Sequence, residues 1–361
     1  MKVHLLERFF GDKETTLLEA GELKASIFTY STGVKAVRLA NAKGNIVALP
    51  FAGQMIWRAE FCGRDLTMKS IYDEPQNCSY YGETYGCFLM HCGLSAMGNP
   101  TAEDTHPGHG ELPLAKYKEA WLELGADDKG EYLALGGVYS HMRCFEANYD
   151  FEPCVKLRPG ASKIEVTASF VNKKDLPLEY YYLCHVNHRP VNGAKLEYSA
   201  PRDTIVVNHE VPQGYPNAKW AAATNAYLAK LDKNPGLMDK IGNPDEAYAP
   251  EIVFAVFHKA DKAGNAHTMQ VLPDGTSVFV THRPKELPYG VRWIARTKDE
   301  DAMGMCLPAT AEHKGRLYCR AHHQERMLAP GKRVTFHIET GFQDKAATRA
   351  MKRAIDAIMK S

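Results

Sequence analysis

Histidine pairs dominate the chemistry that this sequence offers. Fifteen histidines are spread over 361 residues, and several lie one to three positions apart. The pairs are His106 and His109 in HPGHGE, His185 and His188 in CHVNHRP, and His322 and His323 in AHHQE. Because an imidazole accepts or donates a proton near neutral pH, these pairs indicate general acid–base chemistry. Imidazoles also bind metal ions, so the pairs leave a metal site open.

The segment THPGHGELP (residues 105–113) places two histidines and a glutamate between prolines. The Pro-Gly pair at its centre disfavours a helix, so we expect a loop, in which Gly110 lets a ligand approach closely. Glu111 follows His109 by two positions, a spacing that returns both side chains to one face of an extended chain. Three alternatives remain here: a polar turn, a metal site, and an acid–base or sugar site.

The segment YYYLCHVNHRPVNG (residues 180–193) has the residue types of a strand. Alternation places His185 and Asn187 on one face of this strand and His188 on the other. An imidazole and an amide on one face can bind a polyol or a water, and the tyrosines offer stacking surface for a sugar ring. The alternative is a buried histidine that bonds to a backbone carbonyl.

Composition argues against several classes of protein. Lys and Arg number 44 and Asp and Glu number 43, so the formal charge is +1 and we expect no nucleic-acid partner. No run of 18 apolar residues occurs, which predicts no membrane span, and the first residues lack a signal-peptide core. The nine cysteines include no CxxC pair, which favours reduced thiols and a cytoplasmic location.

Short strands are the elements expected to position these side chains. Period-2 alternation over residues 162–171 and 329–342 predicts half-buried strands, and apolar runs over 44–51 and 251–258 predict buried ones. Turn sequences such as RPGAS, PDGT and APGK separate such segments. The pattern therefore predicts a mostly β fold with a few short helices, and without a linker it predicts a single domain over residues 1–361.

Two segments have helical character. Residues 343–360 repeat apolar side chains at helix spacing with Lys and Arg on the other face, which predicts a C-terminal helix packed on the body. Residues 216–233 predict a second helix. Residues 232–250, rich in Pro, Gly and Asp, predict a long surface excursion.

Five sequence blocks, taken in order, carry a resemblance to a known family. They are FLMHCGLSAMGNP (88–100), HPGHGELP (106–113), YYYLCHVNHRPVNG (180–193), AMGMCLPATAEHKGR (302–316) and MLAPGKRVTFHIETG (327–341). They resemble the conserved blocks of the galactose mutarotase-like superfamily, and most closely its poorly characterised aldose 1-epimerase-like branch. The resemblance spans roughly residues 45 to 342.

This resemblance implies a fold and a reaction. The fold is a large antiparallel β-sandwich, the supersandwich of sugar-binding enzymes. The reaction is the interconversion of the α and β anomers of an aldose or sugar acid by acid–base ring opening, without a metal or other cofactor. By position, His109 matches the histidine that contacts the sugar near the ring oxygen. His185 matches the usual general acid, and Asn187 follows it on the same strand face.

The sequence departs from the family pattern at two positions. Glu111 stands where relatives often have arginine, and Leu307 stands where the general base, a glutamate, is expected. Leucine cannot take a proton, so we expect Glu111, or else Glu312, to replace the base. Two other functions remain open: a sugar-binding protein without catalysis, and a metal-dependent sugar isomerase or lyase that uses His106, His109, Glu111 and a later histidine as ligands.

Further residues complete the expected carbohydrate site. With Glu111, His109 and His185 as catalytic residues, the expected substrate-binding residues are His106, Asn187, His188, His282, Arg283, Trp293 and Glu312. Arg283 beside His282 would suit a carboxylate, sulfate or phosphate group, because guanidinium offers a planar fork to oxyanions. We expect no tightly bound metal. The sequence leaves the oligomeric state open, with a homodimer as one alternative.

Overall fold

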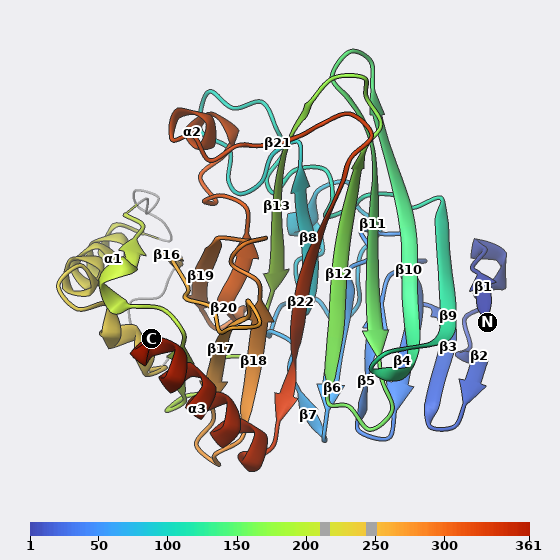
Figure 1. Ribbon diagram of the computed structural model, residues 1–361, viewed down its shortest axis with the longest axis horizontal. Helices are drawn as coiled ribbons and strands as arrows, with labels where there is room; N and C mark the ends of the chain where they lie inside the picture. The colour runs from blue at the N-terminus through green and yellow to red at the C-terminus, as the bar shows by residue number, and fades with distance from the viewer. Residues whose placement is uncertain (210–216, 243–250) are drawn as a thin grey trace.

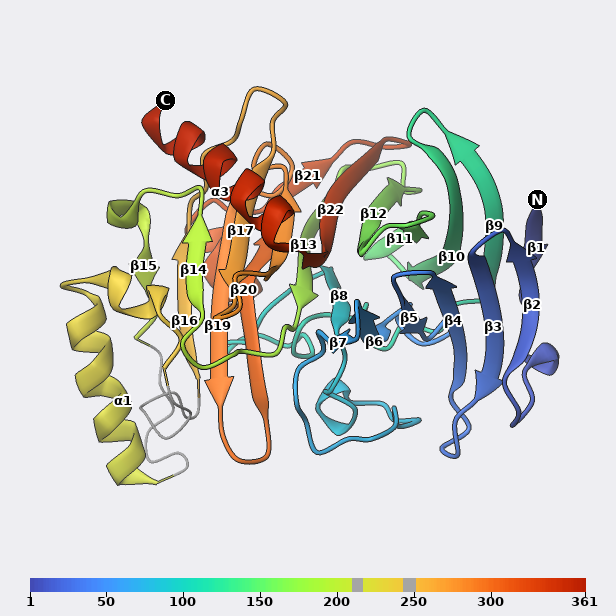
Figure 2. The ribbon, with the colours of Figure 1, turned by 90° about the horizontal axis from the view of Figure 1, so that it is seen from below.

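Two large antiparallel sheets face each other in the computed structural model, which describes residues 1–209, 217–242 and 251–361 (Figures 1 and 2). The nine-stranded sheet has the order β1 (Lys2–His4), β9 (Glu119–Asp127), β10 (Gly130–Arg143), β11 (Ala147–Leu157), β12 (Lys163–Asn172), β22 (Arg333–Gln343), β18 (Ser277–His282), β17 (Ala266–Val271) and β14 (Lys195–Tyr198). The prediction of a mostly β antiparallel sandwich is confirmed.

The second sheet has thirteen strands among the described residues. Its order is β15 (Val206–Val207), β16 (Ile252–Val256), β19 (Tyr289–Arg296), β20 (Asp301–Ala309), β13 (Leu178–Val186), β8 (Leu89–Leu94), β6 (Ile56–Phe61), β5 (Gly44–Ala48), β4 (Lys35–Asn41), β3 (Leu23–Thr29) and β2 (Thr15–Ala20), with β7 (Arg64–Asp65) paired to β6 and β21 (Arg326–Leu328) paired to β13.

The main hydrophobic core fills the space between the two sheets. On β12, the alternation predicted from the sequence buries Ile164, Val166, Ala168 and Phe170, each at most 2% exposed. On the other sheet, Tyr182, Cys184 and Val186 of β13 enter the same core. Burial of such side chains on both inner faces supplies the main driving force for the sandwich.

A second apolar cluster covers the opposite face of the thirteen-stranded sheet. Tyr181 and Leu183 of β13 belong to it, together with Trp293 of β19 and Leu307 of β20. The two faces of β13 therefore divide as the alternation over residues 180–193 predicts. This outer cluster forms the platform on which the candidate site is built.

Helices are few in the described part of the chain. α3 (Lys345–Lys360) lies across the outer face of the nine-stranded sheet, where its Ile355 packs with Met269 and Phe279 (Figure 1). α1 (Ala218–Leu231) begins after Asn217, whose side chain accepts a hydrogen bond from the Trp220 N–H. The remaining short helices are α2 (Arg316–Ala321) and the 3-10 turns η1 (Glu7–Phe9), η2 (Tyr81–Glu83), η3 (Arg202–Thr204) and η4 (Pro235–Asp239).

Two sequence predictions reach beyond the described residues. The expected helix over 216–233 includes residue 216, and the expected excursion over 232–250 includes residues 243–250. These residues lie outside the part of the chain that the structure describes.

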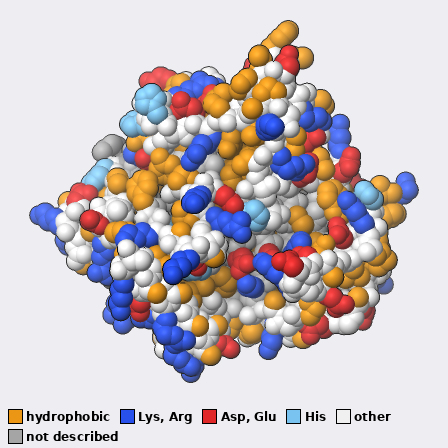
Figure 3. All heavy atoms as spheres, viewed as in Figure 1, with side chains coloured by type: hydrophobic (Ala, Val, Ile, Leu, Met, Phe, Trp, Pro, Cys, Tyr) orange, Lys and Arg blue, Asp and Glu red, His pale blue; other side chains and the backbone are white. Residues whose placement is uncertain are grey.

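On the face that carries α3 and β22, acidic and basic side chains are interspersed (Figure 3). None of the described helices is long and apolar enough to cross a membrane.

Candidate active site

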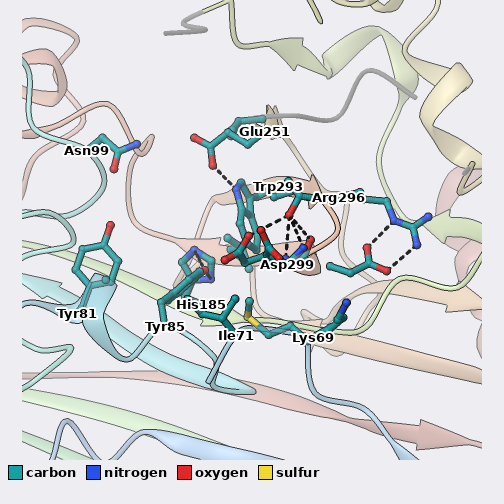
Figure 4. A pocket seen from close by; sticks show the side chains of 18 of the residues that line it. Lys69, Ile71, Tyr81, Tyr85, Asn99, His185, Glu251, Trp293, Arg296 and Asp299 are labelled. Atoms are coloured by element: carbon teal, nitrogen blue, oxygen red, sulfur yellow. Dashed lines mark hydrogen bonds and ion pairs between the residues drawn. The ribbon is translucent and has the colours of Figure 1, made fainter. Parts of the chain in front are cut away.

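A cleft of about 1270 Å³ opens on the outer face of the thirteen-stranded sheet (Figure 4). Its floor is formed by Leu183, His185, Val253, Val291, Trp293 and Leu307, from strands β13, β16, β19 and β20. Residues from the connecting loops and turns add Tyr81, Tyr85, Asn99, His109, Glu251 and His313, and the charged rim includes Lys69, Arg296, Lys298, Asp299, Glu300 and Asp301. The cleft combines apolar walls with a few ionisable groups, which is typical of small-ligand sites.

His109 and His185 lie together in this cleft although they are far apart in the sequence. Their ring centroids are 5.3 Å apart and the rings are nearly perpendicular. His109 comes from the loop before β9 and has a φ of 60°, and its Nδ1 is buried without a hydrogen-bond partner. His185 comes from the end of β13. The structure therefore brings together the two histidines that the sequence singled out.

A fixed hydrogen bond sets the tautomer of His185. Its Nδ1 lies 2.6 Å from Oδ1 of Asn187, and the Asn187 amide donates through Nδ2 to the Cys87 carbonyl oxygen at 3.1 Å. Because Oδ1 can only accept, Nδ1 of a neutral His185 carries the proton and Nε2 is left with a lone pair. The Tyr85 hydroxyl lies 3.3 Å from that Nε2. Asn187 thus orients His185 from behind and does not line the cleft.

Burial keeps the histidines of the cleft neutral. Desolvation lowers the pKa of His185 to about 3, with further lowering by His109. Desolvation also lowers the pKa of His109 and of His313 to about 4. Each of these imidazoles is therefore neutral near pH 7 and keeps a nitrogen lone pair that can accept a hydrogen bond or a proton.

Glu251 is the carboxylate that the sequence analysis missed. It immediately precedes β16, and it accepts a hydrogen bond from the indole Nε1–H of Trp293. Burial raises the pKa of Glu251, and the bond from Trp293 partly offsets the rise. Trp293 also packs against His185, with ring centroids 5.4 Å apart, so Glu251 and His185 both contact one indole (Figure 4). A carboxyl group of raised pKa beside a neutral imidazole is the kind of pair that acid–base catalysis requires.

Glu111 lies outside the cleft, whereas a general base should line it. Its carboxylate accepts hydrogen bonds from the backbone N–H groups of Leu94 and Ser95 at 3.1 and 3.0 Å, and from the Ser95 hydroxyl at 2.5 Å. The Tyr149 hydroxyl donates a fourth bond. Glu111 does not line the cleft. The geometry therefore favours a positioning role in which Glu111 ties the His109 loop to the end of β8.

We expect Glu111→Gln to reduce stability far more than catalysis. An amide cannot accept from all four donors, so unfolding free energy should fall by about 2–4 kcal/mol. Denaturant unfolding measures this loss, and turnover of the folded fraction should change only a few-fold. A variant of unchanged stability whose turnover is lost would instead return the base to Glu111.

The backbone conformation and close packing of the loop require glycine at position 110. Its φ is 75°, and a Cβ there would lie 2.2 Å from the Ala96 carbonyl oxygen and 2.4 Å from that of Gly93. No other residue type fits this approach without moving the backbone. The glycine at position 110 thus allows the loop to pack closely on β8.

Two more expected sugar-binding residues lie near the cleft without lining it. His106 bonds through Nδ1 to the Pro107 carbonyl oxygen at 2.8 Å, and its Nε2 accepts from the Arg316 N–H at 3.3 Å, where α2 begins. Glu312 accepts from Gln324 at 3.0 Å. These contacts hold the loops that surround the cleft. Trp293, by contrast, lines the cleft as expected of a substrate-binding residue.

Three expected sugar-binding residues lie elsewhere. His188 points between the sheets, where its Nε2 lies 3.2 Å from the Thr340 hydroxyl oxygen. His282 is also buried, and Arg283 pairs with Glu286 at 3.2 Å on the nine-stranded sheet. His282 and Arg283 line a second cavity, of about 640 Å³, near α3. The pairing of β18 with β17 and β22 explains the difference, because it places His282 and Arg283 in the sheet that faces away from the cleft.

One group among the described residues has the spacing of metal ligands. His258, His282 and Cys306 offer donor atoms that all lie within 4.8 Å of one another. This group faces the interior of the sandwich and is separate from the cleft. Burial lowers the pKa of His258, the charge of the buried Arg292 guanidinium lowers it further, and the same charge opposes a divalent cation there. Among the described residues, the group with the spacing of metal ligands, His258, His282 and Cys306, therefore lies outside the cleft.

Acid should destabilise this protein through its buried histidines. Desolvation lowers the pKa of His91, His185, His188 and His282 to about 3. The unfolded chain binds protons at these residues from pH about 6.5 downward while the folded chain does not, so stability falls as pH falls. The slope approaches about 1.4 kcal/mol per pH unit for each such histidine. Urea unfolding at pH 7.5 and pH 5.0 measures this loss, and equal midpoints would contradict it.

Comparison with solved structures defines the fold: the chain has the galactose mutarotase-like fold. A provisionally assigned aldose 1-epimerase from Klebsiella pneumoniae subsp. pneumoniae MGH 78578 superposes with a TM-score of 0.80 at 16% identity, over 99% of this chain and 96% of that one. A galactose mutarotase-like protein from Clostridium acetobutylicum gives 0.57 at 12% identity, over 90% and 99%. A provisionally assigned aldose 1-epimerase from Escherichia coli K12 gives 0.52 at 14% identity, over 88% and 99%.

The sequence itself places the chain in a family without a described activity. Residues 31–342 match the family described as Domain of unknown function (DUF4432), and the chain belongs to that family. No curated protein matches the chain in sequence.

Proposed function

We propose that this protein interconverts the α and β anomers of an aldose, with Glu251 and His185 as the acid–base pair. The observation that carries this proposal is the arrangement around Trp293, which contacts a carboxyl group of raised pKa on one side and a neutral imidazole on the other. The galactose mutarotase-like fold supports it, since the Klebsiella relative bears the provisional assignment aldose 1-epimerase. At 16% identity that relative supports the fold and not the activity.

The tautomer of His185 decides the direction of proton transfer. Nε2 of His185 carries the lone pair, so in this proposal it accepts the proton of the anomeric hydroxyl, which takes the place of the Tyr85 hydroxyl that lies 3.3 Å away. Glu251, whose protonated form is favoured by burial, acts as the acid in this proposal and donates its proton to the ring oxygen. The bond between the anomeric carbon and the ring oxygen breaks, and the open aldehyde rotates about its C1–C2 bond. Ring closure on the other face reverses both transfers, so the pair returns to its starting state.

Other residues of the cleft hold the sugar. The faces of Trp293 and Tyr85 offer stacking surface for its C–H groups, and the rings of His109 and His313 line the same cleft. Leu307 lies in the floor of the cleft, where it takes no part in proton transfer. In this proposal Glu251 supplies the carboxyl group that the sequence lacks at position 307, but as the acid, and His185 is the base, which reverses the roles that the family resemblance implies.

Nuclear magnetic resonance over a panel of aldoses tests the proposal. Saturation transfer from protein to sugar detects binding, and magnetisation exchange between α and β signals detects turnover. We expect at least one aldose to bind and to exchange faster in proportion to protein concentration. An aldose that binds but exchanges at the buffer rate would make the protein a sugar-binding protein without catalysis.

A further inference from the structure

Part of the cleft floor consists of aliphatic side chains, which have no hydrogen-bond donor or acceptor. Leu183, Val253, Val291 and Leu307 line the cleft and are 1%, 5%, 2% and 1% exposed. All four belong to the apolar cluster on the outer face of the thirteen-stranded sheet. We call these four residues the aliphatic patch.

Strand pairing makes the aliphatic patch continuous. The strands that carry it are neighbours in the order β16, β19, β20 and β13. Val291 is directly opposite Leu307, and Val253 is directly opposite Trp293. Leu183 is opposite Ala309, two residues along β20 from Leu307. The patch is therefore one surface and not four separate contacts.

The aliphatic patch borders the proposed acid–base pair. Gly304 is opposite Trp293, and a Cβ at Gly304 would lie 2.3 Å from Cδ2 of Leu307. The Leu307 side chain thus folds over Gly304 toward the indole that donates to Glu251. On the neighbouring strand, Leu183 and His185 are two residues apart on one face, which is roughly 7 Å. A pyranose ring at His185 and Glu251 would place one substituent on the patch.

We infer that the aliphatic patch receives an exocyclic methyl group, so that this site takes a 6-deoxy aldose. The inference rests on the proposed function, in which Glu251 protonates the ring oxygen. The methyl group of such a sugar is two bonds from that oxygen, on the side where Leu307 adjoins Trp293. A hydroxymethyl group in the same place would leave its hydroxyl without a hydrogen-bond partner, because the patch offers none.

Matched pairs of sugars test this inference. The probes are 6-deoxygalactose against galactose and 6-deoxymannose against mannose, with 2-deoxyglucose against glucose as a third pair. We expect the 6-deoxy member of both first pairs to exchange anomers with a kcat/KM about 10–100-fold higher, the range that an apolar pocket achieves against an added hydroxyl. Equal or higher values for galactose and mannose would overturn the inference, as would a preference confined to the 2-deoxy pair.

Variants at Leu307 test whether the preference for 6-deoxy sugars arises from the aliphatic patch. Leu307→Gln offers an amide to the hydroxyl, so the ratio within each 6-deoxy pair should fall toward one. Leu307→Met keeps an apolar side chain of similar size and should keep the ratio. Thermal unfolding confirms that both variants fold. An unchanged ratio in folded Leu307→Gln would contradict the role of the patch.

Binding separates failure of this inference from failure of the proposed function. If galactose and mannose exchange fastest, the aldose 1-epimerase proposal stands and the 6-deoxy inference fails. If no sugar exchanges, the proposed catalysis fails, and saturation-transfer affinities for the same pairs decide the inference. Tighter binding of both 6-deoxy members would then uphold it, and equal binding would overturn it.

Discussion

Glu251→Gln is expected to slow anomer exchange by about 10²–10⁴-fold, the contribution of one positioned proton transfer. The amide keeps the shape of the carboxyl group and can still accept the hydrogen bond from Trp293, so sugar binding should be largely retained. Glu179→Gln is the matched control, because Glu179 lies on β13 outside the cleft, where it binds Arg320. Exchange that stays within a few-fold of the unmutated protein would remove Glu251 from the reaction.

Stability and pH distinguish lost chemistry from lost folding in this variant. Burial raises the pKa of Glu251, so the ionised form costs folded stability and the protonated form does not. Glu251→Gln should therefore be at least as stable as the unmutated protein at pH 8, with the difference shrinking toward pH 4. Because the acid must be protonated, activity of the unmutated protein should decline as pH rises through the Glu251 pKa. A variant that unfolds at lower temperature at pH 8 would contradict this assignment.

His185→Gln is expected to produce a loss of similar size, about 10²–10⁴-fold in kcat/KM. Glutamine lacks a nitrogen lone pair that can take the proton of the anomeric hydroxyl, and it breaks the bond that Asn187 makes with Nδ1. His337→Gln serves as the control, because His337 lies on β22 and bonds Glu286 outside the cleft. If His185→Gln binds sugar and exchanges it at the unmutated rate, another group is the base.

Local patterns were sufficient to predict a mostly β chain and one strand of the site. Alternation in residues 180–193 depends only on the two-residue repeat of a strand, and it correctly divided Tyr181 and Leu183 from Tyr182 and Cys184. The position of His185 beside Asn187 follows from the same repeat. Such inferences hold because neighbours along one strand keep their relation whatever the strand pairs with.

Glu251 could not be predicted because its role depends on pairing between strands. The apolar run at 251–258 indicates a buried strand, but it assigns no role to the first residue of that run. Only the pairing of β16 with β19 brings Glu251 to Trp293, and the sequence of neither strand predicts the register of that pairing. A carboxylate at the edge of a buried strand was the one available signal.

His282 and Glu111 show two other limits of sequence reasoning. Proximity of His282 to Arg283 suggested an anion site, but the sheet to which β18 belongs places it away from the cleft. The two-residue spacing of His109 and Glu111 suggested one face, yet positive φ values at His109 and Gly110 turn the chain between them. Spacing arguments apply to extended backbone and fail where the backbone turns.

The most direct test of the account compares anomer exchange rates of the unmutated protein, Glu251→Gln, His185→Gln and the double variant. The protein is first treated with a chelator, and the sugar is the fastest member of the panel. Because the two groups act as one unit, we predict that each single variant loses nearly all acceleration and that the double variant is no slower than the worse single one. Independent, multiplicative losses, or full exchange in either single variant, would contradict an acid–base pair of Glu251 and His185.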